Sequence, residues 1–352
     1  EEPFDIDQTT AAGSLQPSLL ETGRSDEKFD CQSPEEETLT GWEVGALLMR
    51  HPTVLLGNKP ECDTVEKLLQ QGNEAEKSAI MRWMCKDLLS AAEDQCACRV
   101  VQELLKAPSK SDGSMMLAKI FPYTDRLLES QHGNHVLTKA VEVAIPAEIA
   151  TVIDKVWRTG AVYVAKHRFG CRLCERLIEH HGEDHAVVAL LNSLALSSVE
   201  MCKHRYGNYV LQSMVEHGPA GPTKKVFEAL VPKMGEMAVH RFASHLAQKM
   251  LQVDCPPADK LKAAEALIRD SSHPLAEIAA NRFGNFVIND MLSFLTTEED
   301  IDKDKRVALV EEIREKLNVE NEELTKTEHF KSVKATLDDC WNTLQNDEDQ
   351  EG

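Results

Sequence analysis

The chain has 352 residues, of which 42% are hydrophobic and 28% charged, so it has enough apolar side chains to bury a large core. Its 10 cysteines lack the dense, even spacing of a secreted disulfide framework, which favours reduced thiols in a cytosolic or nuclear protein. No run of about 18 apolar residues is present to span a membrane, and the opening EEPFDIDQTT has neither region of a signal peptide.

The net charge of −20 is concentrated at the two ends of the chain. Residues 1–40 contain 2 basic and 11 acidic residues, residues 296–352 contain 8 and 18, and residues 90–295 contain 23 of each. The middle is therefore neutral and leaves room for one basic face. Residues 1–40, rich in acidic and hydroxyl side chains, are predicted to be a disordered segment, and residues 343–352 a short acidic tail.

A short pattern recurs between these ends, in CACRVVQEL, HGNHVLTKA, FGCRLCERL, YGNYVLQSM, FASHLAQKM and FGNFVINDM. We call the third residue of each run the anchor: Cys98, Asn134, Cys171, Asn208, Ser244 and Asn285. The spacings are 36, 37, 37, 36 and 41 residues, and degenerate copies around Cys62 and Glu328 extend the series. Such a period predicts a solenoid, in which each unit buries its apolar face against its neighbours.

Each unit is predicted to be helical. In RYGNYVLQSMVEHG the apolar residues form one stripe of a helix, at Tyr206, Val210, Leu211, Met214 and Val215. Gly218 ends this helix, and the preceding LLNSLALSSVEMCKH predicts another. β-patterned segments are absent, so the fold class is predicted to be all-α, a curved α-solenoid of about eight helical repeats over residues 41–342 with atypical ends as caps.

A second face of the repeated helix is not explained by packing. The residue after the anchor has a flat side chain in all six clear units: Arg99, His135, Arg172, Tyr209, His245 and Phe286. Planar groups spaced one per repeat can stack on successive unpaired bases, and each stack contributes roughly 1–3 kcal/mol. The alternative, a merely solvated face, does not require one flat residue in the same register of six repeats.

The anchor and the fourth residue after it are neighbours on one face of the helix. The fourth residues are Gln102, Thr138, Glu175, Gln212, Gln248 and Asn289. Most members of both sets are small or polar. We expect them to lie on a side of the helix other than the apolar stripe and to hydrogen-bond the exposed edges of the stacked bases.

The repeats resemble those of the Pumilio (PUF) family of RNA-binding proteins, through GNHV, GCRL, GNYVLQ and FASHLAQ, over roughly residues 45–340. The resemblance implies a right-handed solenoid of PUF-type repeats that reads about one base of single-stranded RNA per repeat, with the chain antiparallel to the RNA. In that family Asn with Gln favours uracil, Cys or Ser with Gln favours adenine, and Ser with Glu favours guanine.

Three pairs match this pattern: Asn208 with Gln212 for uracil, and Cys98 with Gln102 and Ser244 with Gln248 for adenine. Three pairs depart from it: Cys171 with Glu175, Asn134 with Thr138, and Asn285 with Asn289. A carboxylate only accepts hydrogen bonds, so Glu175 should suit the N1–H and N2–H donors of guanine. The resulting expectation is a core near U-A-U-G-U-A, 5′ to 3′, with weak first, fourth and fifth bases.

Other signals are weaker. Basic residues just before the anchors are interpreted either as phosphate contacts or as solvated residues that hold neighbouring repeats together: Lys166, Arg168, Lys203, Arg205, His240, Arg241 and Arg282. His181 and His185 are spaced like zinc ligands on a helix but are expected to be a solvated surface pair without a third ligand. We expect no metal, no cofactor, no catalytic residue and no enzymatic activity.

The function expected from the sequence is sequence-selective binding of single-stranded RNA. The resemblance implies a monomer in the cytoplasm that binds 3′ untranslated regions of messenger RNA, regulates translation or stability, and recruits protein co-regulators. Two alternatives remain open: a divergent PUF-like protein that binds ribosomal precursor RNA in the nucleus or nucleolus, and a helical-repeat scaffold that binds proteins.

Overall fold

The computed structural model describes residues 41–106, 110–253 and 255–346. The predicted disordered segment, residues 1–40, lies outside these described residues, as do residues 347–352. The described residues form helices and no strand, which confirms the all-α class. None of the helices among them is both long enough and apolar enough to cross a membrane.

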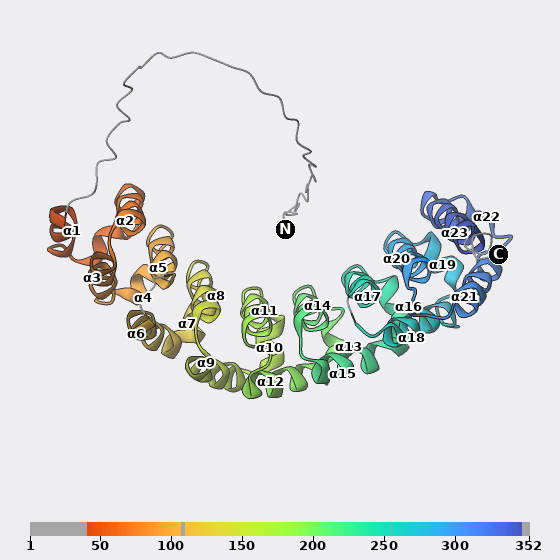
Figure 1. The fold of residues 1–352 in the computed structure, drawn as a ribbon, viewed down its shortest axis with the longest axis horizontal. Helices are drawn as coiled ribbons and strands as arrows, with labels where there is room; N and C mark the ends of the chain where they lie inside the picture. The colour runs from red at the N-terminus through yellow and green to blue at the C-terminus, as the bar shows by residue number, and fades with distance from the viewer. Residues whose placement is uncertain (1–40, 107–109, 254, 347–352) are drawn as a thin grey trace, which may run out of the picture. The chain divides into compact units, whose positions relative to one another are not determined.

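Each complete repeat consists of a long first helix, a short second helix and a third helix (Figure 1). The first helices are α3 (Glu74–Met84), α6 (Lys110–Ile120), α9 (Pro146–Thr159), α12 (His185–Ala195), α15 (Ala220–Leu230), α18 (Pro257–Ile268) and α21 (Lys303–Lys316). The short helices are α4 (Leu88–Glu93), α7 (Thr124–Glu129), α10 (Ala161–Lys166), α13 (Ser198–Met201), α16 (Met234–Ala238), α19 (Leu275–Ala280) and α22 (Glu322–Thr325). The 3-10 turns η2 (Phe121–Tyr123) and η3 (Val231–Lys233) precede α7 and α16.

The third helices carry the sequence pattern. They are α5 (Ala97–Leu105), α8 (Gly133–Val143), α11 (Gly170–His181), α14 (Gly207–His217), α17 (Ala243–Gln252), α20 (Gly284–Thr297) and α23 (Glu328–Asn346). A shorter N-terminal unit, made of α1 (Gly41–Leu48), η1 (Pro52–Leu55) and α2 (Lys59–Gln71), supplies an eighth through α2.

The third helices lie side by side in chain order. Each one packs against the next, from α2 through α23, and in Figure 1 they form the inner row of the array while α9, α12 and α15 lie on its outer row. The described residues thus form the curved α-solenoid of about eight repeats that the period predicts.

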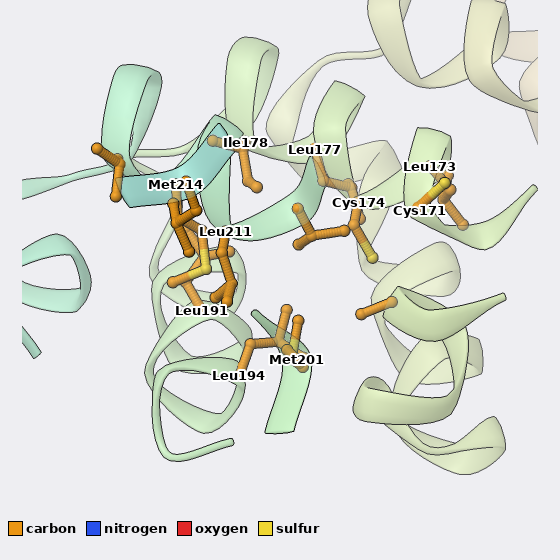
Figure 2. Packing of buried hydrophobic residues seen from close by; sticks show 14 of the residues in the cluster. Cys171, Leu173, Cys174, Leu177, Ile178, Leu191, Leu194, Met201, Leu211 and Met214 are labelled. Atoms are coloured by element: carbon orange, nitrogen blue, oxygen red, sulfur yellow. The ribbon is translucent and has the colours of Figure 1, made fainter. Parts of the chain in front are cut away.

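The core is continuous from one repeat to the next. Figure 2 shows Leu177 and Ile178 of α11, Leu191 and Leu194 of α12, and Leu211 of α14 packed together across two repeats, and all five side chains are buried. The apolar stripe of each helix therefore contacts its neighbours, and no repeat has a core of its own.

Gly170, at the first turn of α11, permits a close approach between a short and a third helix. A Cβ atom built there would lie 2.2 Å from the carbonyl oxygen of Val164 in α10. We expect Gly170→Ala to lower the free energy of unfolding by about 1–3 kcal/mol, measured by urea unfolding, because the two helices must move apart.

Gly113→Ala, in α6, is the matched control. A Cβ atom there meets nothing within 4 Å, so this variant should be stabilised by about 0.5–1 kcal/mol through the better helix propensity of alanine. Equal unfolding free energies for Gly170→Ala and the wild type would contradict the close approach.

The boundaries of the repeats differ slightly from those expected. Helix α1 begins at Gly41, where the sequence analysis places the start of the domain. Helix α23 continues to Asn346 and fully buries Leu344, so residues 343–346 belong to the last helix rather than to a solvated tail.

Candidate nucleic-acid interface

The turn before each third helix holds the helix start through one side chain, four residues before the anchor. In three consecutive repeats this residue is a histidine whose Nδ1 accepts two backbone N–H groups at 3.2–3.4 Å: His167, His204 and His240. Asp94, Ser130 and Asn281 accept the equivalent N–H groups in other repeats. Sequence analysis did not identify this role, although an acceptor four residues before each anchor was a visible signal.

The anchors are buried, which was not predicted from the sequence. All six anchor residues have only 1–5% of their surface exposed to solvent. The Nδ2 groups of Asn134, Asn208 and Asn285 donate at 2.8–2.9 Å to the carbonyl oxygen of the residue four positions earlier. One N–H of each amide is thus used by the turn, and the second N–H of Asn134 donates to Gln131, which orients the Oδ1 atom of each anchor asparagine as an acceptor.

The two cysteine anchors are likewise turned onto the preceding turn. Sγ of Cys171 lies 3.6 Å from the carbonyl oxygen of Arg168, and Sγ of Cys98 lies 3.8 Å from that of Gln95. Burial raises the pKa of the Cys171 thiol to about 11. Both anchors are therefore neutral thiols at physiological pH, with little polar surface of their own.

The flat residues after the anchors are all exposed, as expected. Among them, Tyr209 is 44% and Phe286 54% exposed. One surface hollow is lined by Asn208 and Tyr209 together with His245 of the next helix, and another by Asn134 and His135 with residues of both neighbours. The structure thus brings anchors and flat residues of adjacent repeats to shared hollows.

The fourth residues after the anchors are half-buried except for Glu175. Nε2 of Gln212 donates to Oδ1 of Asn208 at 2.8 Å, which links the two members of the predicted uracil pair. Nε2 of Gln248 donates at 2.8 Å to Asp290 on the next third helix. The hydroxyl of Thr138 donates to backbone carbonyl oxygens of its own helix. These bonds fix the orientation of each group before any ligand binds.

Glu175 is buried, with 6% of its surface exposed. Its Oε2 atom accepts from Nη1 of Arg172 at 3.0 Å, whereas its buried Oε1 atom has no partner. Burial raises the pKa of the Glu175 carboxyl, against the opposing effect of Arg172. An unpartnered buried acceptor costs free energy, so this position favours a ligand that brings a donor.

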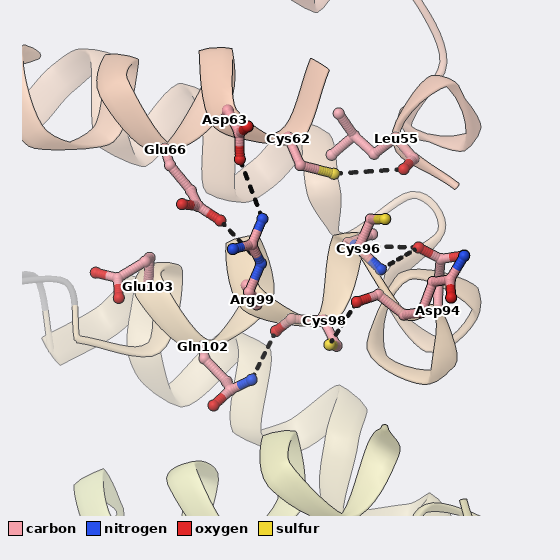
Figure 3. Close-up of polar contacts among 12 residues, drawn as sticks. Leu55, Cys62, Asp63, Glu66, Asp94, Cys96, Cys98, Arg99, Gln102 and Glu103 are labelled. Carbon is pink, nitrogen blue, oxygen red and sulfur yellow. Dashed lines mark hydrogen bonds and ion pairs between the residues drawn. The ribbon is translucent and has the colours of Figure 1, made fainter. Parts of the chain in front are cut away.

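Acidic side chains of α2 lie beside the first flat residue, at the N-terminal end of the row of third helices (Figure 3). Arg99 forms ion pairs with Asp63 at 3.0 Å and Glu66 at 3.7 Å, both on α2. Asp63 follows Cys62 where clear repeats have a flat side chain. The degenerate first unit therefore neutralises the flat residue of its neighbour and offers no plane for stacking.

The last unit is in a different register from the expected one. Oγ1 of Thr327 accepts from the backbone N–H of Phe330 at 3.2 Å, as the capping residues of other repeats do. The anchor position therefore falls on Lys331 rather than Glu328, 46 residues after Asn285. Ser332 follows it, so this unit also lacks a flat residue.

Three of the basic residues before the anchors have structural roles. Lys166 pairs with Glu200, and Lys203 with Glu236, in each case in the following repeat. Nδ1 of His240 is used by its helix cap. The two lysine contacts support the interpretation that such residues hold neighbouring repeats together.

His181 and His185 are not a solvated pair on one helix. His181 ends α11, is buried, and its Nε2 lies 2.8 Å from the carbonyl oxygen of Val141, while His185 begins α12 and is exposed. Among the described residues, no group of three or more His, Cys, Asp or Glu is arranged to hold a metal ion.

The capping histidines predict a pH dependence of stability. Burial lowers the pKa of His204 and His240 below their ordinary value of 6.5, with nearby Lys166 and Lys203 adding to the effect. The stabilisation is complete above pH 6.5 and is lost as the pH falls towards the folded-state pKa, because the unfolded chain then binds more protons. We expect the free energy of unfolding, measured with urea between pH 7.5 and 5, to fall as the pH is lowered. The decrease should be at most about 1.4 kcal/mol per histidine for each pH unit.

His204→Asn with His240→Asn is the matched control. Asn281 provides the same cap in α20 without a titrating group, so the double variant should keep the fold and flatten the dependence between pH 6.5 and 5. An unchanged pH profile would show that these caps do not titrate.

These features define the class of the protein: an α-helical solenoid with one exposed flat side chain and a polar or small anchor on the third helix of each central repeat. A family model described as the Pumilio-family RNA binding repeat matches residues 92–121, 130–156, 161–192, 198–231, 233–262 and 275–303, just over half of the chain. The chain belongs to the Pumilio (PUF) family, a family of RNA-binding proteins rather than enzymes. The six matches are the six units with a clear anchor.

Relatives and solved structures agree with this assignment. A Pumilio domain-containing protein of Schizosaccharomyces pombe is 23% identical over 250 residues, 71% of this chain and 35% of the relative. Pumilio homology domain family member 4 of Saccharomyces cerevisiae is 23% identical over 199 residues, 54% of this chain and 21% of the relative. The chain thus spans well under half the length of these relatives.

The likeness to solved structures concerns the fold. PUF-8 in complex with PBE-RNA has a TM-score of 0.75 at 19% identity, covering 88% of this chain and 87% of that chain. The Puf4 RNA binding domain bound to the HO endonuclease RNA 3′ UTR recognition sequence has a TM-score of 0.69 at 19% identity, covering 83% and 90%.

Proposed function

We propose that this chain binds single-stranded messenger RNA in 3′ untranslated regions, selectively for sequence, and regulates translation or stability. The observation that carries the proposal is the row of six exposed flat side chains, one on each third helix from α5 to α20. Bases can lie between neighbouring members of this row, because His135 with Arg172, and Tyr209 with His245, border surface hollows that are also lined by polar groups. The 3′ UTR sequence bound by the similar Puf4 domain supports the choice of target.

Base selection is proposed to follow the pairs of anchor and fourth residue, with a core near U-A-U-G-U-A. Two positions have the best structural support: the third base, and the fourth base, which was expected from the sequence to be weak. Asn208 and Gln212 are already joined by a hydrogen bond, and Asn208 lines one hollow together with Tyr209, which suits uracil. Glu175 has a buried acceptor without a partner, which suits the two donors of guanine.

The regulatory part of the proposal needs partners, since the solenoid has no catalytic group assigned to it. Protein co-regulators recruited by a monomeric chain in the cytoplasm would supply the effect on translation or stability. Co-purification from RNase-treated extract separates protein-mediated from RNA-mediated partners.

Fluorescence anisotropy with labelled eight- to ten-nucleotide RNAs, at fixed near-physiological salt, tests the proposal. We expect tight binding to an oligomer that contains UAUGUA, weaker binding to one with UGUA, and little binding to a scrambled control. Tyr209→Ala with Gln212→Ala should lower the affinity for the first RNA by roughly 10- to 1000-fold, since one stack and one base-edge contact are lost.

The outcomes separate the alternatives. A strong preference for UGUA would overturn the proposed core while keeping sequence-selective binding. Equal, weak binding to all three RNAs would favour a structural-RNA binder such as one for ribosomal precursors. No binding to any RNA would favour the protein-binding scaffold.

A further inference from the structure

Four arginines form a regular row along the third helices, three residues before the anchor. Each guanidinium lies over the aromatic ring of the next residue: Arg168 at 4.4 Å from the centroid of Phe169, Arg205 at 4.8 Å from Tyr206, Arg241 at 4.5 Å from Phe242, and Arg282 at 4.6 Å from Phe283. All four arginines are exposed, whereas the rings beneath them are half-buried. We call these four residues the arginine row.

The arginine row differs from the other cations of this surface in having no ion pair among the described residues. Cations in the middle of the third helices are paired with carboxylates of their own or an adjacent helix: Lys139 with Glu142, Arg176 with Glu179, and Lys249 with Glu216. The lysines just before the row are paired with the following repeat, and Arg99 and Arg172 are paired with glutamate or aspartate. The row therefore holds the cations of this surface that are left for an external anion.

Stacking on a ring prepares each guanidinium for such a ligand. A flat guanidinium over a ring face is partly immobilised, and its N–H donors point outward in the plane, a fork that fits two phosphate oxygens. The anchored geometry reduces the entropy lost when the anion binds. A stacked arginine thus suits phosphate better than a free lysine does.

The row lies beside the candidate base positions. Arg241 and Arg282 line the same hollow as Asn208, Tyr209 and His245. A base placed in that hollow brings its own sugar-phosphate within reach of the row. The same position in the two preceding repeats is occupied by Gln95 and Gln131, which carry no charge.

We propose that Arg168, Arg205, Arg241 and Arg282 are a phosphate-binding row that holds the RNA backbone along α11, α14, α17 and α20. The repeats of α5 and α8 bind their nucleotides without such contacts. Salt-dependent affinity is thereby confined to one half of the bound RNA. This inference rests on the proposed function, because it assumes that RNA lies along the third helices.

The test is the salt dependence of binding, by fluorescence anisotropy of the UAUGUA-containing RNA from 50 to 200 mM KCl. Each phosphate contact with single-stranded RNA contributes about 0.7 to the slope of log affinity against log salt. The wild type should therefore lose about 50-fold in affinity over this range through the row. Arg205→Gln with Arg241→Gln should lower the slope by about 1.4, equally for cognate and scrambled RNA.

Lys166→Gln with Lys203→Gln is the charge-matched control. It removes the same net charge from neighbouring positions, but these lysines are paired with glutamates, so the slope should change by much less than 1.4. Compared with the glutamine variant, Arg205→Lys with Arg241→Lys should regain most of the slope but less of the affinity. Lysine restores the positive charge without the planar N–H donors of the guanidinium group. Circular dichroism of each variant establishes that the helices are retained.

Uncharged linkages locate the contacts. Methylphosphonates at the four linkages that face the row should lower the slope by about 2.8, twice the effect of Arg205→Gln with Arg241→Gln, and those in the other half of the oligomer should not lower it. Equal slopes for the arginine and lysine variants would overturn the phosphate-binding role of the row, and so would equal effects of methylphosphonates in the two halves of the oligomer. Base-selective binding would remain intact in either case. A wild type that binds none of the RNAs would instead remove the proposed function together with this inference.

Discussion

Replacement of Arg172, Tyr209 and His245 together by alanine is expected to lower RNA affinity by at least about a hundredfold. These residues stand on three consecutive third helices, α11, α14 and α17, and all three are exposed. Each removed stack costs roughly 1–3 kcal/mol, and 1.4 kcal/mol corresponds to a factor of ten. Anisotropy with the UAUGUA-containing RNA measures the loss.

The loss should be nearly the same for RNAs of different sequence, because every base has a face that can stack. Tyr123→Ala is the control: this tyrosine is 47% exposed in η2, outside the third helices, and its removal should leave binding unchanged. If the triple variant bound RNA with unchanged affinity, the flat residues would not stack on bases.

Glu175→Gln is expected to reverse the base preference at the guanine position. In the wild type the unpartnered Oε1 atom favours the guanine donors, and discrimination of about 1–3 kcal/mol is expected for a good base-edge contact. Glutamine adds a donor and removes the charge, so the variant should prefer adenine. Anisotropy with paired oligomers containing UAUGUA and UAUAUA measures both preferences.

The same substitution should remove a pH effect on specificity. Because burial raises the pKa of the Glu175 carboxyl, the wild type should begin to lose its preference for guanine at a higher pH than an ordinary glutamate would allow, as protonation turns an acceptor into a donor. The variant should not show this loss. Glu179→Gln, one turn later and paired with Arg176, should keep the wild-type preference and pH profile.

The sequence predicts the solenoid and the flat residues well, for a physical reason. The period, the apolar stripe and the exposed position of Tyr209 all repeat, so six copies reinforce each signal. The burial of anchors such as Asn208 was not predicted, because a hydrogen bond from a side chain to its own turn leaves no periodic trace. The role of His204 was missed although an acceptor recurs four residues before each anchor, because the recurrence alone does not show which backbone N–H groups the side chain binds.

Two other differences have causes in particular residues. Lys166 and Arg168 are two positions apart and equally basic, and only the placement of Glu200 in the following repeat separates the paired cation from the unpaired one. The last register was misplaced because Phe330 stands where other repeats have glycine or alanine, so the pattern that marks the other anchors is missing. Neither fact can be derived from spacing alone.

The contact of Arg99 with Asp63 and Glu66 has a consequence for how much information the protein can extract from a transcript. The first unit has two carboxylates in place of a stacking plane, and the last unit has no flat residue. The RNA sequence that the described repeats can recognise is therefore limited to six bases. A six-letter word occurs by chance about once in 4,000 nucleotides, so it appears in a large fraction of long untranslated regions. Selection among transcripts would therefore depend on how strongly each base position discriminates and on a second binding event on the same transcript. The weak positions of α8 and α20 are then as important for selection as the strong ones.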